Sequence, residues 1–163
     1  MISRSRRAFV LSYATVMGIF VSRIYVRPAY AVAAPALKYL IHAGEQAKAN
    51  VEKLIKTEQV ITLACIAYPL DTYAQEVNNI APLLPPSVRG VASILTHVAG
   101  GVHSARTEKQ ASEVIQDGIV QIRKTIELIR AEDPDSSDAR LEAGSIILTL
   151  GYMDRKLLTA EGI

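Results

Sequence analysis

Apolar positions along most of the chain recur with the spacing of helices. Beginning near Pro35, small or apolar residues return every three or four positions, with lysines and glutamates between them. One buried face of an α-helix produces this pattern. It predicts helices over residues 36–56, 58–80, 88–102 and 137–159, and a further helix whose apolar stripe runs from Val114 to Ile129.

Proline and glycine mark the expected breaks. Three prolines within residues 81–87 predict a non-helical connector. Pro69 lies inside the second helix and is expected to kink or restart it, because its ring removes a backbone donor. The pair Gly100-Gly101 predicts the end of the third helix.

Two polar segments predict how the last helices begin. Thr107-Glu108-Lys109-Gln110 matches a capping box, in which the threonine accepts from a first-turn amide and the glutamine reaches back. The acidic run over residues 132–138 predicts a turn that supplies caps and negative charge to the next helix N-terminus.

These elements predict an all-α fold, an antiparallel bundle of four to five helices in a single domain over residues 32–163. The segment from Ile146 to Leu150 is rich in β-branched residues, but it has no flanking turn residues, so it is interpreted as helix. Gly118, Gly144 and Gly151 lie inside helical patterns, where each costs about 1 kcal/mol relative to alanine. Close approach of helices in the core is the expected compensation.

Residues 1–31 have the three regions of an export signal in the right order. A basic start precedes an apolar stretch over residues 8–21, and small residues follow Pro28. This stretch is too short for a stable membrane anchor, which needs about 20 apolar residues. Cleavage is expected after Ala31, with Ala29 at the third-last position, or after Ala33.

The segment Ser5-Arg6-Arg7-Ala8-Phe9 resembles the motif of twin-arginine signal peptides, with Arg6 and Arg7 as the receptor-read pair. Val10 and Leu11 depart from the usual Leu-Lys ending. The resemblance implies export of a folded protein to a periplasm or thylakoid lumen. The alternative is a mitochondrial or plastid transit peptide, because the first 44 residues contain no acidic residue.

Charge and cysteine content argue against nucleic-acid binding and against stabilisation by a disulfide. Residues 1–31 hold five basic residues and no acidic one, so their removal leaves a net charge of −3. Nothing in the remainder therefore favours binding to nucleic-acid phosphates. Cys65 is the only cysteine, so no intramolecular disulfide forms, and apolar burial must provide stability.

Candidate chemistry is sparse. His42 and Glu45 have the three-residue spacing of a bundle metal motif in reverse order, and His97 and His103 are the other histidines. Ser93 and His97 are four apart, but no nucleophile elbow, phosphate loop or dinucleotide fingerprint accompanies them. The sequence predicts a non-enzymatic protein without a cofactor.

The predicted role is binding of a protein partner, as an assembly, inhibitor, immunity or accessory protein, with a membrane complex as one possible partner. Apolar residues beside Pro69 and in the connector are the candidate contact patch, namely Tyr68, Leu70, Tyr73, Leu83 and Leu84. The alternative is that the connector is tucked over the bundle end.

Two alternatives belong to other classes. The capping box and the amphipathic helix after it resemble the last helix of PsbQ-like extrinsic photosystem II proteins, over about thirty residues. That resemblance implies a lumenal helix bundle that docks on a photosynthetic membrane complex. A small-molecule or metal carrier is the other alternative, since the twin-arginine route passes folded proteins.

Overall fold

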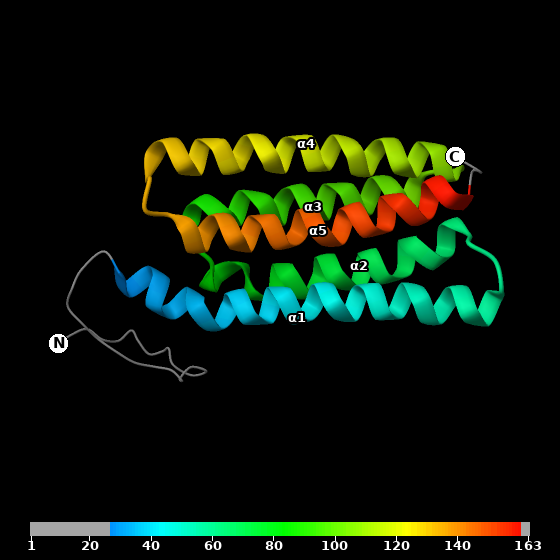
Figure 1. Cartoon of the computed structure of the whole chain (residues 1–163), viewed down its shortest axis with the longest axis horizontal. Coiled ribbons are helices and arrows are strands. Elements are labelled where there is room, and N and C mark those ends of the chain that lie inside the picture. Colours follow the sequence, from blue (N-terminus) through cyan, green and yellow to red (C-terminus); the bar gives the residue numbers. More distant parts are fainter. Residues whose placement is uncertain (1–26, 161–163) are drawn as a thin grey trace.

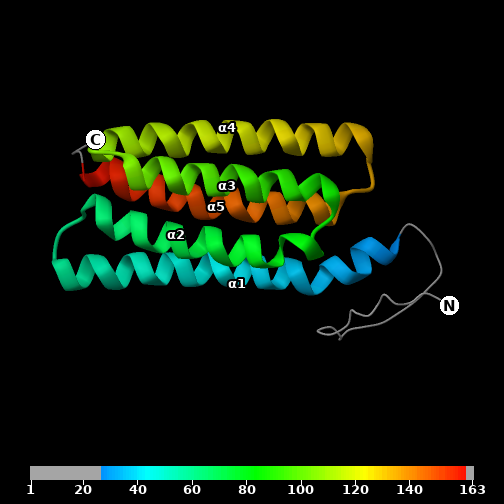
Figure 2. The ribbon, with the colours of Figure 1, turned by 180° about the vertical axis from the view of Figure 1, so that it is seen from behind.

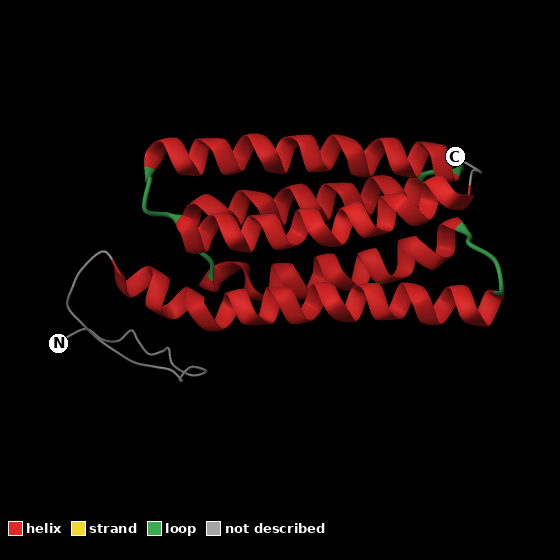
Figure 3. Ribbon diagram, in the orientation of Figure 1, coloured by secondary structure: helices red, strands yellow, loops and turns green. Residues whose placement is uncertain are grey.

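The computed structural model describes residues 27–160, and it is helical almost throughout that range. The helices are α1 (Arg27–Glu58), α2 (Leu63–Ile80), α3 (Pro86–Ser104), α4 (Glu108–Glu132) and α5 (Ser137–Ala160), with a short 3₁₀ turn, η2 (Ala81–Leu83), after α2. No strand is present in this part of the chain (Figure 3). The prediction of an all-α helix bundle is confirmed.

The five helices form a closed ring in which each contacts the next, and α5 returns to α1. Consecutive helices are antiparallel, as short connections require. Because the number of helices is odd, α1 and α5 run in the same direction and begin at the same end of the bundle (Figures 1 and 2). The seam between α1 and α5 is therefore the one parallel contact between neighbours in the ring, while α3 and α5, which are also parallel, make a smaller contact across it.

The core lies along the axis of this ring and is built from one stripe of each helix. Burial of a large aliphatic side chain contributes about 1.5–3 kcal/mol, so these stripes dominate stability. On α5 the stripe follows the three- and four-residue spacing closely, with Ala139, Ala143, Ile146, Leu150, Met153 and Leu157 all buried. No helix within residues 27–160 is both apolar enough and long enough to cross a membrane.

The first two helices differ from their predictions at the ends. α1 begins at Arg27, well before the predicted start, and ends where Gln59 adopts a φ of 61°. The amide of Gln59 donates to Ile55 O at 2.7 Å, which closes the last turn. α2 continues without a break through Pro69, so the predicted restart there is wrong. Pro69 is buried, and packing against neighbours holds this helix together across the missing donor.

The third helix begins earlier and ends later than predicted, since it spans Pro86–Ser104 and not residues 88–102. Pro86 is its first residue, a position where the missing N–H costs nothing. Gly100 and Gly101 lie inside the helix, so the predicted stop at this pair is wrong. A Cβ on Gly101 would lie 2.7 Å from Val114 Cγ1, so this glycine lets α3 approach α4 closely.

The capping box at the start of α4 is confirmed. Thr107 Oγ1 accepts from the amide of Gln110 at 3.1 Å. The side chain of Gln110 reaches back and accepts from the amide of Arg106 at 2.9 Å, one residue before the cap. The first bond satisfies an amide that the helix leaves free, and the second fixes the backbone of the residue before the cap.

The expectation for the interior glycines holds at one of three positions. A Cβ on Gly118 would overlap Val98 Cγ2, so α3 and α4 meet there. The expectation is wrong for Gly144 and Gly151. A Cβ on Gly144 would meet no atom within 4 Å, and one on Gly151 would touch only Arg155 Nη1 at 3.7 Å.

Polar contacts fix α5 against both of its neighbours in the ring. Toward α4, Asp154 accepts from Ser112 Oγ and, at 3.2 Å, from Gln116 Nε2. Toward α1, Glu52 accepts from Tyr152 Oη and pairs with Lys156 Nζ at 2.8 Å. The contacts of Glu52 help to set the register of α1 against α5, and thereby the surface that the two helices share.

Candidate functional site: a groove between α1 and α5

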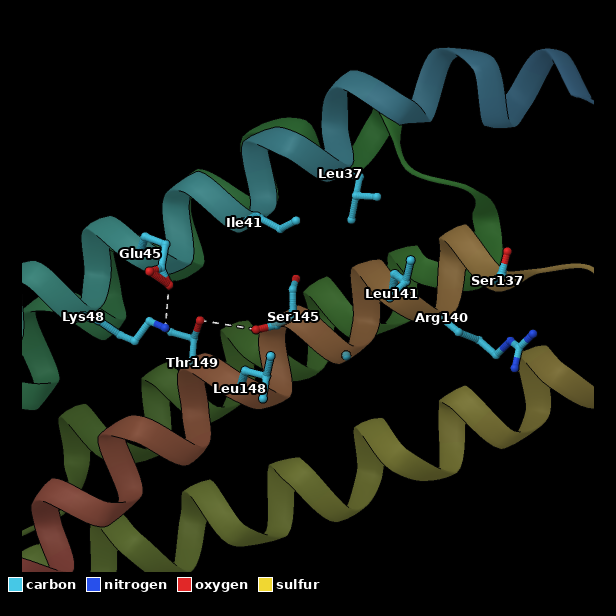
Figure 4. Close-up of a pocket in the computed structure, with 11 residues that line it drawn as sticks. Leu37, Ile41, Glu45, Lys48, Ser137, Arg140, Leu141, Ser145, Leu148 and Thr149 are labelled. Atoms are coloured by element: carbon cyan, nitrogen blue, oxygen red, sulfur yellow. Dashed lines mark hydrogen bonds and ion pairs between the residues drawn. The ribbon is translucent and has the colours of Figure 1, made fainter.

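A groove of about 770 Å³ runs along the parallel seam between α1 and α5 (Figure 4). α1 supplies one wall and α5 the other wall and the floor, and a groove of this volume falls in the range of ligand sites. Its lining residues are Leu37, Ile41, Glu45 and Lys48 from α1, and Ser137, Arg140, Leu141, Gly144, Ser145, Leu148 and Thr149 from α5.

The groove walls expose large aliphatic side chains to water. Leu148 is 71% exposed, Leu141 61% and Ile41 50%. Figure 4 shows Leu37 and Ile41 on α1 and Leu141 and Leu148 on α5, along the two sides of the groove. These exposed side chains line one groove on adjacent helices, so a single ligand could cover them together.

The floor is shaped by small residues. Gly144 lines the groove and leaves open space where a side chain would stand. Further along, Gly44 lets the two helices approach closely, because a Cβ on it would overlap Thr149 Oγ1. The seam is therefore tight at Gly44 and hollow around Gly144.

The polar groups of the groove are mostly satisfied within the chain. Lys48 Nζ pairs with Glu45 Oε1 at 2.5 Å. Ser145 Oγ donates to Glu142 O at 2.7 Å, and Thr149 Oγ1 donates to Ser145 O at 3.3 Å. The hydroxyls of Ser145 and Thr149 are thus bonded to the α5 backbone, whereas Arg140 Nε is buried without a hydrogen-bond partner among the described residues. The groove therefore offers a ligand mainly its apolar walls, with this one unpaired donor among its lining residues.

Beside the groove, Glu142 is a fully buried carboxyl, with 0% of its surface exposed. Neither carboxylate oxygen has a hydrogen-bond partner among the described residues. Loss of hydration raises the pKa of Glu142 to about 7, and the negative charge of Asp138 one turn earlier adds to the rise. At neutral pH this carboxyl is therefore poised between its two protonation states.

The sequence analysis did not single out Glu142, although a signal was present. Glu142 lies three positions after Ala139 and four before Ile146, both of which are buried. This spacing places all three on one helix face. The sequence also contained a signal for the groove. Leu141 and Leu148 are seven positions apart, which places them on one face of α5, and that face is not the core stripe.

The predicted contact patch of five residues does not form one exposed surface. Tyr68 is 66% exposed, but Leu70, Tyr73 and Leu84 are buried, and Leu83 is half-buried against the core. The expectation of an exposed Leu83-Leu84 loop is wrong, because the 3₁₀ turn folds Leu84 into the core. The connector is tucked over the bundle, as the alternative interpretation had it.

The candidate metal ligands lie apart. His42 and Glu45 are exposed on α1, and Glu45 pairs with Lys48. His97 and His103 lie on α3, where His103 Nδ1 is 3.1 Å from Asp71 Oδ2. Within residues 27–160, no three His, Cys, Asp or Glu side chains are grouped so that they could hold a metal ion.

The predicted signal residues fall at or beyond the edge of the described range. Arg6 and Arg7 lie outside it. Ala29 and Ala31 belong to the first turns of α1, because this helix begins at Arg27. Cleavage after Ala31 would therefore remove the first five residues of the helix.

Comparison of the chain with protein-family models, with curated proteins and with solved structures finds no match.

Proposed function

We propose that the protein is a non-enzymatic binding protein, which holds a helix of a protein partner in the groove between α1 and α5. The observation that carries this proposal is the set of aliphatic side chains left in water along one seam, with Leu148 71% exposed and Leu141 61% exposed. A partner that covered them would remove this apolar surface from water, which favours binding.

The shape of the groove favours a helix as the occupant. From Leu37 to Lys48 it follows α1 for about 17 Å at 1.5 Å per residue, which matches about three turns of a bound helix. An amphipathic helix places its apolar residues into such a groove at three- and four-residue spacing. The open space at Gly144 would receive one of these side chains.

Export is the second part of the proposal. The basic start, the apolar stretch and the Ser5-Arg6-Arg7 motif support a cleaved signal over residues 1–31. The remaining chain carries a net charge of −3 and a single cysteine, which is buried. The partner is therefore proposed to lie in the periplasm or the thylakoid lumen, either free or as part of a membrane complex.

Affinity capture from the native organism tests the proposal. The tagged protein is compared with Leu141→Asp and Leu148→Asp, which put a charge on the groove wall. If the groove binds the partner, each variant loses at least about 1.5 kcal/mol of apolar contact, which is more than tenfold in affinity.

Leu128→Asp is the matched control, because Leu128 is a 62% exposed leucine on α4, outside the groove. The proposal predicts one protein that the unmodified chain and the Leu128 variant both retain and the two groove variants lose. Recovery of the same proteins by all four chains would remove the groove as the binding surface.

A further inference from the structure

We propose that the protein pairs with a second copy of itself, with α5 of each copy packed antiparallel on α5 of the other across a two-fold axis level with Ile146. This pairing goes beyond the proposed function and needs no other partner, so it is tested on the purified protein alone. Because it covers Leu141 and Leu148, the two copies must separate before a partner helix can occupy the groove.

The outward face of α5 carries leucines and glycines in alternation. Its members, which we call the outer stripe, are separated by three, four and three positions and so share one helix face, namely Leu141, Gly144, Leu148 and Gly151. The two leucines are 61% and 71% exposed, and in Figure 1 α5 lies in front of α3 with no described helix in front of it. The outer stripe is therefore free to meet another molecule.

The two glycines of the outer stripe have no packing role within the described part of the chain. A Cβ on Gly144 would meet no atom within 4 Å, and one on Gly151 would touch only Arg155 Nη1 at 3.7 Å. Each glycine weakens its helix relative to alanine. A second helix that lies close against α5 would give both positions a use, because a missing side chain leaves room for a side chain of that helix.

The spacing of the outer stripe makes it complementary to itself. In an antiparallel pair of helices related by a two-fold axis, residues equally far from the axis on opposite sides meet. Leu141 and Gly151 each lie five positions from Ile146, and Gly144 and Leu148 each lie two positions from it. A single axis therefore places both leucines of each copy over the glycines of the other, as knobs over holes.

The charges at the ends of α5 are complementary under the same axis. Arg155 lies nine positions after Ile146, and Ser137, the first residue of α5, lies nine before it. Arg155 of one copy would therefore reach the start of α5 in the other, where Asp135 and Asp138 are exposed. None of these three side chains forms an ion pair with a described residue. A second copy is favoured over an unrelated helix because one axis satisfies the apolar and the charged contacts together.

Sedimentation equilibrium of the purified protein tests the inference. One helix face per copy is a small interface, so we expect association in the micromolar range, with the mass of two chains approached as the concentration rises from about 1 to 200 µM. Leu148→Asp should remain a single chain throughout, whereas Leu128→Asp, on α4, should associate as the parent does. The mass of one chain at every concentration of the parent, or equal weakening by both variants, would overturn the inference.

Gly151→Glu separates the pairing from the groove, because Gly151 does not line the groove. Glutamate is a good helix former, so α5 is retained while a charge is placed opposite Leu141 of the second copy. Far-ultraviolet circular dichroism checks the helix content. We expect this variant to remain a single chain, and association that it leaves intact would overturn the inference.

Exchange of charges tests the antiparallel arrangement itself. One chain carries Arg155→Glu, and a second carries both Asp135→Arg and Asp138→Arg. Each chain alone brings like charges together across the axis and should associate about tenfold more weakly than the parent. An equal mixture restores opposite charges at both ends and should associate as the parent does. A mixture that associates no more tightly than either chain alone would overturn the inference.

Discussion

Stability should fall as the pH rises through the range in which Glu142 titrates. Burial raises the pKa of this carboxyl from 4.5 to about 7. Below pH 4.5 the group is protonated in both the folded and the unfolded chain, so the full stability is present. Between pH 4.5 and 7 the unfolded chain ionises first, and the free energy of unfolding declines until the folded chain ionises as well.

The size of this decline follows from the shift in pKa. At about 1.4 kcal/mol per pH unit, the full shift corresponds to about 3 kcal/mol. Glu142 lies in the second turn of α5, close to the solvated end of the bundle, so screening reduces the effect. We expect about 1–2 kcal/mol, which is a substantial fraction of the stability of a small domain.

Urea unfolding of the protein and of Glu142→Gln, measured from pH 4 to pH 8, checks this prediction. The amide does not ionise, so the difference in free energy of unfolding between variant and parent should rise by about 1–2 kcal/mol between pH 4.5 and 7. Glu113→Gln, on the exposed side of α4, provides the baseline for loss of a surface carboxylate. A Glu142→Gln difference that stays flat with pH would refute the reasoning.

Glu52 changes the free energy of unfolding in a different pH range, so its effect can be measured separately from that of Glu142. Its hydrogen bonds to Lys156 and Tyr152 lower the pKa of its carboxyl. Its contribution to stability is therefore present above pH 4.5 and is lost as the pH falls further. The decline assigned to Glu142 lies above that range.

Four further predictions concern stability, each measured by chemical denaturation. Gly118→Ala should destabilise by about 1–2 kcal/mol, because the new methyl overlaps Val98, whose branched side chain has little freedom in a helix. Gly151→Ala should instead stabilise by about 0.5–1 kcal/mol, since a Cβ fits there without overlap. Leu150→Ala should cost about 2–5 kcal/mol by leaving a cavity in the core. Thr107→Ala should cost about 1 kcal/mol by removing the cap of α4. The opposite sign at either glycine would contradict the packing described here.

Helix positions were predictable because each helix buries one regular stripe and begins at a recognisable signal. α4 begins directly after Thr107, the cap that the sequence predicts, and α5 begins at the predicted residue, Ser137. The predicted helix ends and breaks were wrong where tertiary packing overrode local preference. Gly100 and Gly101 do not end α3, because Gly101 instead provides a close contact with α4. Pro69 does not restart α2, since the helix is held by its buried face.

The site was harder to predict because it depends on which helices become neighbours. Leu37 and Ile41 belong to the apolar stripe of α1 in the sequence, yet Ile41 is half exposed. Its exposure follows from the parallel pairing of α1 with α5, which no local pattern encodes. The prediction for Leu83 and Leu84 was wrong in the opposite sense. They were expected to be exposed, but the loop between the prolines packs back against the core.

Site-specific photocrosslinking in the native organism tests the central proposal most directly. A photoreactive residue replaces Leu148 in the groove or Leu128 on α4 in otherwise unchanged chains. If the mature protein holds a partner helix between α1 and α5, the probe at position 148 forms one covalent adduct with another protein, and the probe at position 128 forms none. Adducts at position 128 with none at position 148 would contradict the account.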